Sequence, residues 1–164
     1  VRNVHNMNKN LTQPISRTTI FTEKIDESLF FWKNLLGFNI IIEASIPNPG
    51  ASQIIGFGCE SLNVTVLSSN NSSIGNIGLA EIINPHITLN RKPNTNNIIF
   101  GETCIVIRTD NLREILKSLQ KFNSNIISLP TKLELPIDDE VWEMFVRDPN
   151  GVLVNLSHHG EWKE

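Results

Sequence analysis

The 164-residue sequence predicts an α+β fold, in which two tandem βαβββ modules form a curved mixed sheet around a shared cavity, with helices on the outer face. Two observations predict it. Residues 17–40 and 104–127 superpose without a gap, at a constant offset of 87 residues, and each stretch reads as strand, amphipathic helix and strand. After each stretch, short apolar runs alternate with turn residues, as strands of a sheet do. We expect the functional site where the two copies meet.

The two copies agree at both polar and apolar positions. Thr22 corresponds to Thr109 and Glu27 to Glu114, and apolar residues correspond to apolar residues throughout. Each helix has one apolar stripe at helical spacing, formed by Ile25, Leu29, Trp32 and Leu36 in the first copy and by Leu112, Ile115, Leu119 and Phe122 in the second. We therefore expect each helix to bury a single face.

Capping and turn residues mark the ends of the elements. Asp26 and Asp110 are placed to cap or oppose the positive helix ends, and Gly37 is placed to end the first helix. The Asp-Pro-Asn-Gly sequence at 148–151 predicts a hairpin turn, because proline presets one dihedral angle and Asn-Gly accepts positive φ. We expect the remaining strands at 38–43, 62–67, 77–83, 126–129, 141–147 and 152–157, with loops at 47–58 and 130–140.

These elements divide the chain into two modules of one integrated domain. The expected parts are a polar N-terminal tail at 1–14, a first module at 15–84, a connector at 85–100, a second module at 101–158 and a C-terminal tail at 159–164. A chain of this length buries a substantial apolar interior, but neither half is large enough to be comfortable alone.

Composition excludes several classes of partner. The formal net charge is −3, and no cluster of Lys or Arg with interleaved aromatics favours nucleic acid or an anionic membrane surface. Apolar runs are too short to span a bilayer, and the Asn-rich start does not resemble a secretory signal. The two cysteines, Cys59 and Cys104, fit free thiols in a reducing compartment, so we expect a cytoplasmic protein.

Two segments carry a family resemblance. Residues 143–156, EMFVRDPNGVLVNL, resemble the last hairpin of the glyoxalase/bleomycin resistance/dioxygenase proteins, which form the vicinal oxygen chelate superfamily. Residues 17–38, RTTIFTEKIDESLFFWKNLLGF, resemble the opening strand and helix of their first module. The resemblance implies paired βαβββ modules. It does not imply one reaction, since the superfamily includes isomerases, lyases, ring-cleaving dioxygenases, epimerases and drug-sequestering proteins.

The resemblance also implies where a divalent metal would be held, on the first and last strand of each module. Those positions fall on Arg17 and Glu81 in the first module and on Cys104 and Asn155 in the second. Only Glu81 is of the ligand type that the family uses. An arginine stays protonated, offers no lone pair and repels a cation. We therefore interpret Arg17 as a replacement for the metal, either paired with Glu81 or binding an anionic oxygen of the ligand.

Strand alternation predicts the wall of the cavity, because residues two apart share a face. One set is expected to line the cavity, namely Arg17, Thr19, Phe21, Cys104, Val106, Arg108, Leu153, Asn155 and Ser157. A second set is expected to pack under the helices, namely Ile20, Ile105, Ile107, Val154 and Leu156. An apolar cavity with two arginines suits a small organic anion or a polar aromatic molecule.

Two residues keep alternative interpretations. Cys104 is either a structural thiol, which we favour, or a soft metal ligand or nucleophile. His159 continues the face of Asn155 if the last strand extends that far, and it is then a further metal-ligand candidate. The sequence contains no Gly-rich phosphate loop, zinc-protease motif, Cys-x-x-Cys pair or nucleophile elbow.

Two functional classes remain. We favour a metal-independent protein that binds or sequesters a small molecule, as a pseudo-symmetric monomer or a homodimer, with Arg17 as the anchor and no cofactor. The alternative is a lyase, isomerase or dioxygenase. Such an enzyme would use a non-standard metal site built from Glu81, Asn155, Cys104 and His159, or metal-free chemistry with Glu81 and Arg17 as catalytic residues.

Overall fold

A computed structural model describes residues 12–84, 97–136 and 139–162. Most of the expected N-terminal tail and most of the expected connector lie outside these described residues. The first module contains β1 (Arg17–Phe21), α1 (Ile25–Leu29), the π-helix η1 (Phe30–Leu35), β2 (Asn39–Pro47), α2 (Gly50–Ile55), β3 (Ser61–Ser68) and β4 (Asn76–Ile83). The second module contains β5 (Cys104–Arg108), α3 (Leu112–Lys121), β6 (Asn125–Leu133), β7 (Val141–Arg147) and β8 (Leu153–His159).

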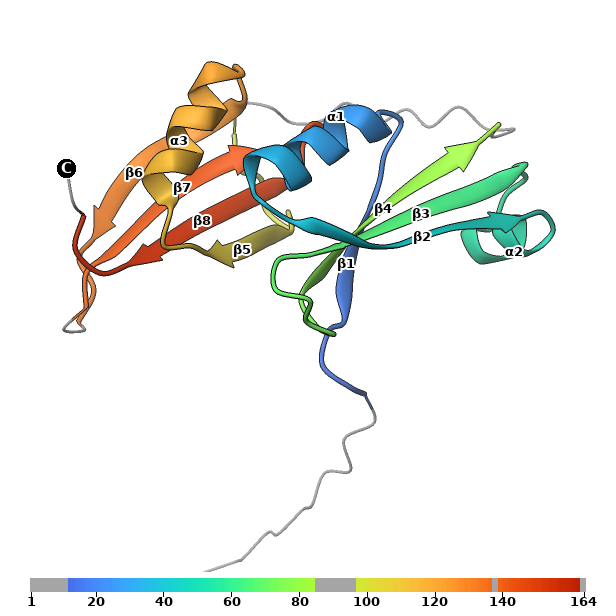
Figure 1. The fold of residues 1–164 in the computed structure, drawn as a ribbon, viewed down its shortest axis with the longest axis horizontal. Coiled ribbons are helices and arrows are strands. Elements are labelled where there is room, and N and C mark those ends of the chain that lie inside the picture. The colour runs from blue at the N-terminus through green and yellow to red at the C-terminus, as the bar shows by residue number, and fades with distance from the viewer. Residues whose placement is uncertain (1–11, 85–96, 137–138, 163–164) are drawn as a thin grey trace, which may run out of the picture.

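The strands form two mixed four-stranded sheets with the same topology. Their orders are β1-β4-β3-β2 and β5-β8-β7-β6, and in each sheet the first strand runs parallel to its neighbour while the other pairs are antiparallel. Figure 1 shows the edge strands β1 and β5 at the middle of the molecule and α1 and α3 together over one side of the sheets. The α+β fold with two βαβββ modules is thus confirmed, and hydrogen bonding divides the expected curved sheet into two.

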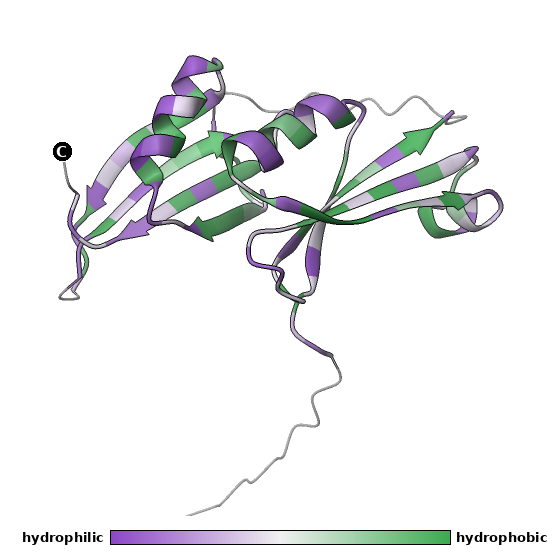
Figure 2. Ribbon diagram, viewed as in Figure 1, coloured by the Kyte–Doolittle hydropathy of each residue, from purple (hydrophilic) through white to green (hydrophobic). Residues whose placement is uncertain are grey.

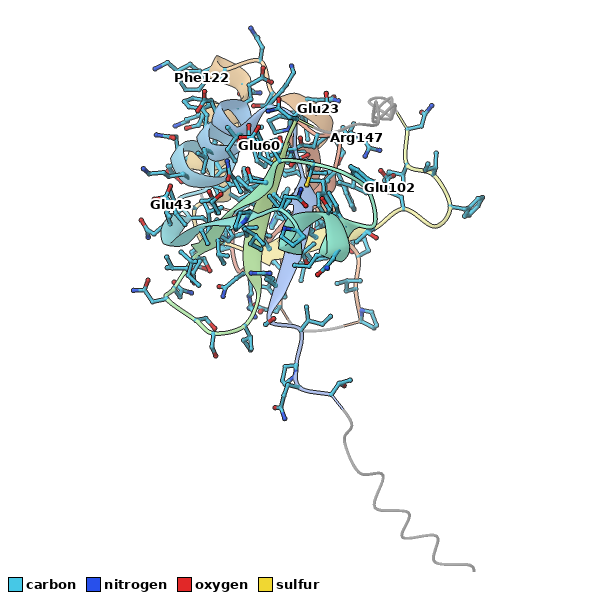
Figure 3. The ribbon with its side chains drawn as sticks, turned by 90° about the vertical axis from the view of Figure 1, so that its right-hand side faces the viewer. Glu23, Glu43, Glu60, Glu102, Phe122 and Arg147 are labelled. Carbon is cyan, nitrogen blue, oxygen red and sulfur yellow. The ribbon has the colours of Figure 1, made fainter. Side chains whose placement is uncertain are left out.

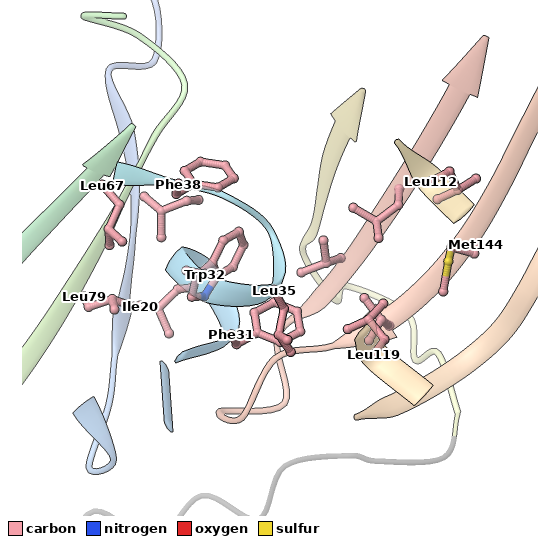
Figure 4. Packing of buried hydrophobic residues seen from close by; sticks show 14 residues of the cluster. Ile20, Phe31, Trp32, Leu35, Phe38, Leu67, Leu79, Leu112, Leu119 and Met144 are labelled. Atoms are coloured by element: carbon pink, nitrogen blue, oxygen red, sulfur yellow. The ribbon is translucent and has the colours of Figure 1, made fainter. Parts of the chain in front are cut away.

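The larger apolar core lies between α1, η1, α3 and both sheets, and a smaller cluster of Ala51, Cys59, Leu62 and Ala80 packs α2 against the first sheet. Trp32 of η1 is fully buried in a cluster whose other members come from the first sheet, from α3 and from the second sheet (Figure 4). The residues expected under the helices all belong to this core, namely Ile20, Ile105, Ile107, Val154 and Leu156. Along the strands, hydrophobic and hydrophilic residues alternate, as a sheet with one packed face requires (Figure 2). The helix-packed face of each sheet is therefore fixed by the sequence pattern.

The strand register defines which positions of the two modules are equivalent. In the first sheet one row across the strands is Thr19, Gly78, Val66 and Ile42. The corresponding row of the second sheet is Val106, Asn155, Phe145 and Ser128. Both sheets have a register shift just before the last member of the row, at Ile40/Ile42 and at Ile126/Ser128. The duplication therefore extends to an irregularity of the sheet that the sequence comparison did not predict.

The ungapped correspondence ends inside the first helix. Twenty-three residues separate Thr19 from Ile42, whereas twenty-two separate Val106 from Ser128, so the offset falls by one before the second strand. The extra residue is accommodated by η1, where Leu36 N donates to Phe31 O at 3.1 Å across the wider π-helical turn. The expected correspondence is thus correct for the first strand and wrong for the second.

Both helices begin after the same threonine turn. Thr22 Oγ1 accepts a hydrogen bond from Lys24 N at 3.0 Å, and Thr109 Oγ1 accepts one from Asn111 N at 3.0 Å. Asp26 lies in the first turn of α1 and Asp110 precedes α3, and neither helix has a side-chain cap hydrogen bond. Neither aspartate caps its helix, but Asp26 opposes the positive helix end from the first turn of α1, which was the other predicted role. Gly37, at φ 78°, ends the first helix as predicted.

Two expected loops contain regular structure. The stretch 47–58 holds the short helix α2, which ends at Gly56 in the left-handed conformation (φ 83°). β6 continues to Leu133 through Pro130, because a register shift between Ser128 and Thr131 removes the need for a proline N–H on this edge strand. No helix in the described part of the chain is long and apolar enough to cross a membrane.

Candidate functional site

The face of each sheet opposite the helix-packed core is called here the open face. Its residues on the edge strand of the first sheet are Arg17, Thr19 and Phe21, and Gly78 of β4 lies beside them. In the second sheet the open face carries Cys104, Val106, Arg108, Glu143, Asn155 and Ser157. Phe21 and Val106 are 55% and 67% exposed, so large apolar side chains on this face are in contact with solvent. The residues expected to line one cavity thus lie on the open faces of two separate sheets.

Arg17 lies over a glycine. A Cβ atom at Gly78 would meet Thr19 Oγ1 at 2.8 Å and Arg17 Cδ at 3.5 Å, so the missing side chain makes room for both residues. Gly78 pairs with Thr19 as Asn155 pairs with Val106, and it is therefore the first-module equivalent of Asn155. The sequence analysis placed Glu81 at this position, and that prediction is wrong by three residues along β4.

Glu81 lies elsewhere in the first sheet. Arg17 pairs with Asn76, so Glu81 is five residues further along β4, about 16 Å away at 3.3 Å per residue, and on the opposite face. There it lines a hollow of about 420 Å³ with Glu43, Asn63 and Leu29 of α1. The hypothesis that Arg17 pairs with Glu81 is therefore wrong, and a metal or catalytic site that needs Glu81 beside Asn155 is not formed by this arrangement.

The second module brings Cys104, Asn155 and a glutamate together. Asn155 is buried and its Nδ2 donates to Glu143 Oε2 at 2.9 Å. Burial raises the pKa of the Cys104 thiol, and the carboxylates of Glu102 and Glu143 raise it further, against the lowering effect of a hydrogen bond from the Asn155 backbone. The thiol form is favoured at neutral pH, which agrees with the structural interpretation of Cys104 and disfavours a thiolate nucleophile.

Comparison with known proteins identifies the architecture. No protein-family model matches the sequence, and no curated protein does either. Among solved structures, a glyoxalase family protein from Bacillus cereus superposes with a TM-score of 0.72 at 17% identity, covering 94% of this chain and 99% of that chain. A glyoxalase/dioxygenase from Nostoc punctiforme gives a TM-score of 0.60 at 12% identity, covering 98% and 97%. Leishmania major glyoxalase I, described as trypanothione-dependent, gives 0.56 at 17%, covering 90% and 87%.

This chain has the glyoxalase/dioxygenase fold. The fold expected from the two sequence segments is therefore confirmed, and identities of this size establish the fold alone. The strand register places the four positions that the sequence resemblance implied for a metal on Arg17, Gly78, Cys104 and Asn155.

These four residues do not fit a divalent metal. A guanidinium stays charged and repels a cation, a glycine has no side-chain donor, and an asparagine adds no charge. The only ligand of appropriate softness is a thiol whose pKa is raised by burial. Within the described residues, no three His, Cys, Asp or Glu side chains are grouped so as to hold a metal ion. His159 does not join the four residues, because it lies four positions beyond Asn155 on β8, about 13 Å along the strand at about 3.3 Å per residue. Its Nδ1 lies 3.9 Å from Asp139 Oδ2.

Sequence reasoning missed Glu143, although a signal for it exists. The hairpin turn at 148–151 fixes the register of β7 on β8, in which Glu143 pairs with Ser157. Because paired residues share a face, the alternation that placed Ser157 in the cavity wall also placed Glu143 there. Glu143 could therefore have been predicted from the register of this hairpin.

Sequence reasoning also missed a buried ion pair beside the open face. The Arg147 side chain has no exposed surface, and its guanidinium pairs with Glu102 through both Nη atoms (Figure 3). It also donates to Gly151 O and to Asn97 O, each at 2.7 Å. Since Glu102 and Asn97 lie just before β5, Arg147 fixes the entry to the second module, and its bond to Gly151 ties that segment to the hairpin between β7 and β8.

A second hollow, of about 550 Å³, lies between the modules on the helix side. Its walls include Phe30 and Phe31 of η1, Phe122 after α3, and Asp148. The rings of Phe30 and Phe122 meet edge to face at 4.9 Å between centroids. This hollow is distinct from the open face and contains none of the residues that the sequence predicted for the site.

Proposed function

We propose that this protein binds a small polar or anionic organic molecule on the open face, without a divalent metal. The observation that carries the proposal is the replacement of a metal-ligand position by Arg17, which lies over Gly78 with its chain along the open face. The Arg17 guanidinium supplies the positive charge that an anionic oxygen would otherwise find in a metal.

The chemistry of the open face supports this proposal. Arg17 and Arg108 both lie on exposed edge strands, and neither has an ion-pair partner among the residues that the structure describes. Phe21 and Val106 add exposed apolar area beside them. Apolar surface with a few uncommitted polar groups is the usual composition of a small-molecule site.

The test is a thermal-shift screen of small carboxylates and polar aromatics, followed by calorimetry on the best ligand. We expect Arg17→Ala to weaken binding about tenfold or more, and Arg17→Lys to recover part of it. Lys33→Ala is the matched control, because Lys33 is an exposed cation on the helix side. Equal stabilisation of wild type and Arg17→Ala by every ligand would remove Arg17 from the site.

The metal-free part of the proposal has its own test. Purified protein is incubated with Mn, Fe, Ni and Zn, dialysed and submitted to elemental analysis. We expect substoichiometric metal. Stoichiometric metal that is lost in Cys104→Ser or Asn155→Ala would overturn this part, because it would show that the two second-module positions still hold an ion.

A second candidate function is a metal-free isomerase or lyase. Glu143 favours it, because a half-buried carboxylate held by Asn155 on the open face is placed as a general base, the role first given to Glu81. The observable is exchange of a ligand's carbon-bound proton in D₂O, followed by NMR. Exchange that disappears in Glu143→Gln but not in Glu81→Gln supports this candidate, and its absence in wild type removes it.

We also propose a homodimer in the cytoplasm. The exposed side chains of Phe21 and Val106 support a second copy against the open faces, and the free thiols of Cys59 and Cys104 fit a reducing compartment. Light scattering after size exclusion tests the dimer. A monomer at concentrations well above those of the binding assays would contradict it.

A further inference from the structure

One row of the second sheet presents opposite charges on either side of a hydroxyl. Ser157 of β8 pairs with Arg108 of β5 on one side and with Glu143 of β7 on the other. All three side chains lie on the open face, because the residue next to each in sequence belongs to the helix-packed core, namely Ile107, Leu156 and Met144. The order across the strands is therefore cation, hydroxyl, carboxylate.

The spacing of this row is set by the sheet. Neighbouring strands lie about 4.8 Å apart, so the backbones of Arg108 and Glu143 are about 10 Å apart, with Ser157 midway. Paired side chains on one face are close enough to touch the same small molecule. Ser157 itself is only 4% exposed, so a ligand that lies over it makes its main contacts with the longer side chains of Arg108 and Glu143 on either side.

In the described part of the chain, each of the three groups keeps at least one polar atom without a hydrogen-bond or ion-pair partner. Arg108 has no ion pair there, and the Ser157 hydroxyl makes no hydrogen bond to another described residue. Glu143 accepts one hydrogen bond, from Asn155 Nδ2, which leaves its other oxygen available. The nearby guanidinium of Arg147 does not neutralise Glu143, because it is paired with Glu102.

Asn155 holds the carboxylate of Glu143 in place. Its Nδ2 donates to Glu143 Oε2, so its orientation is fixed, and its buried Oδ1 has no hydrogen-bond partner. A buried amide oxygen without a partner lowers stability, so the unpaired Asn155 Oδ1 calls for an explanation. A role for Asn155 in orienting the Glu143 carboxylate supplies one. Asn155 is thus a positioning residue for Glu143.

We infer that the open face of the second module binds a zwitterion, a small molecule with both a carboxylate and an amine, of which amino acids are the simplest class. Its carboxylate lies on Arg108, its ammonium group on Glu143, and its centre over the Ser157 hydroxyl. This inference rests on the proposed function, narrows its ligand class, and assigns the carboxylate to Arg108 of the second sheet instead of Arg17. A plain anion satisfies Arg108 but leaves Glu143 unpaired, and a dianion brings a like charge against it.

The experiment compares ligands that differ by one charge. Calorimetry measures the affinity of glycine against acetate, β-alanine against propionate, and γ-aminobutyrate against both butyrate and butylamine. We expect at least one zwitterion to bind about tenfold or more tightly than its matched carboxylate, and γ-aminobutyrate more tightly than butylamine. The chain length of the best zwitterion reports the distance between the two charged groups.

Variants assign the two charges to residues. Glu143→Gln is expected to remove the preference for the zwitterion while leaving the affinity of the carboxylate within about twofold, and Glu143→Asp to restore part of the preference. Arg108→Gln is expected to weaken both ligands of a pair. Glu114→Gln is the matched control, because Glu114 is an exposed glutamate in the first turn of α3.

The outcomes separate this inference from the proposal on which it rests. If carboxylates bind with dependence on Arg17 or Arg108 but no zwitterion binds more tightly, the inference is wrong and the proposed function stands. If neither the zwitterions nor the carboxylates bind, both are wrong. A zwitterion preference that survives Glu143→Gln also overturns the inference, since the ammonium group is then held elsewhere.

Discussion

Gly78 has the most specific role of any single residue near the candidate site. Its lack of a side chain lets Thr19 and Arg17 lie across β4, and a built Cβ would approach Thr19 Oγ1 to 2.8 Å, closer than real contacts allow. The equivalent position in the second module is Asn155, whose side chain instead reaches Glu143. One pair of equivalent positions thus makes room for a cation in one module and orients an anion in the other.

We predict that Gly78→Ala destabilises the protein through overpacking, by about 1–3 kcal/mol. Thr19→Ala removes the hydroxyl that the new methyl group meets, so the double variant is expected to recover most of the loss. Chemical denaturation of the wild type, both single variants and the double variant measures this. Additive losses in the double variant would mean that Thr19 is not the obstacle.

The Arg147–Glu102 pair combines burial with charge. Removing one member leaves the other charge buried without its partner, so Glu102→Gln is expected to lower the free energy of unfolding by about 3–5 kcal/mol. The matched control is Glu27→Gln, which breaks an exposed pair with Lys24 at 3.0 Å and is expected to change stability little. Urea unfolding curves compare the two. Similar small losses would show that Glu102 is not required at the entry to β5.

The thiol of Cys104 reports on its neighbouring carboxylates. Because burial and the charges of Glu102 and Glu143 raise its pKa above the ordinary 9.0, less thiolate is present at any given pH. In a Cys59→Ser background, the rate of reaction with a disulfide reagent is expected to rise with a midpoint above pH 9. Glu143→Gln removes one of the raising charges and is expected to move that midpoint down. A midpoint below 9 in the parent protein would contradict this account.

At the scale of the element, the sequence predicted what depends on local pattern. The helix stripes, the first strands and the hairpin at 148–151 follow from periodicity and turn chemistry, and the strands and the hairpin are confirmed. The stripes are confirmed except at Phe122, which is 49% exposed and lies outside the core. The same information failed at η1, because one inserted residue in a helix leaves the apolar spacing nearly unchanged but shifts every later position. The break in the offset is visible only in the pairing of β2 with β3.

The same distinction explains the errors at the candidate site. Arg17, Cys104 and Asn155 were placed correctly, because β1, β5 and β8 begin at clear boundaries. Glu81 was misplaced because β4 is preceded by a loop, 69–75, whose length does not fix the register of the strand. Glu81 was chosen because it is a carboxylate near the expected position, whereas the pairing of β4 with β1 puts Gly78 at that position. Register, rather than residue type, was the missing information.

At the scale of the whole molecule, η1 and its tryptophan join the two modules. Trp32 is fully buried and contacts both modules. Its ring packs in the common core, and its Nε1 donates to Asp148 Oδ2 at 3.3 Å in the second module. Asn150 Nδ2 adds a second link, donating to Ser28 Oγ at 3.0 Å. The modules are thus separate as sheets but not as cores, which predicts a single unfolding transition.

Substitution of Trp32 tests whether that core is one cooperative unit. Trp32→Ala removes the largest fully buried side chain and is expected to lower the free energy of unfolding by about 3–5 kcal/mol. Trp32→Phe keeps most of the apolar contact and loses the bond to Asp148, so its loss is expected to be smaller, about 1–3 kcal/mol. Hydrogen exchange distinguishes the two architectures. With one core, Trp32→Ala reduces amide protection in β7 and β8 as much as in β3 and β4, because global opening governs exchange in both sheets. Protection that falls in the first sheet alone would show two independently stable modules joined only at their surfaces.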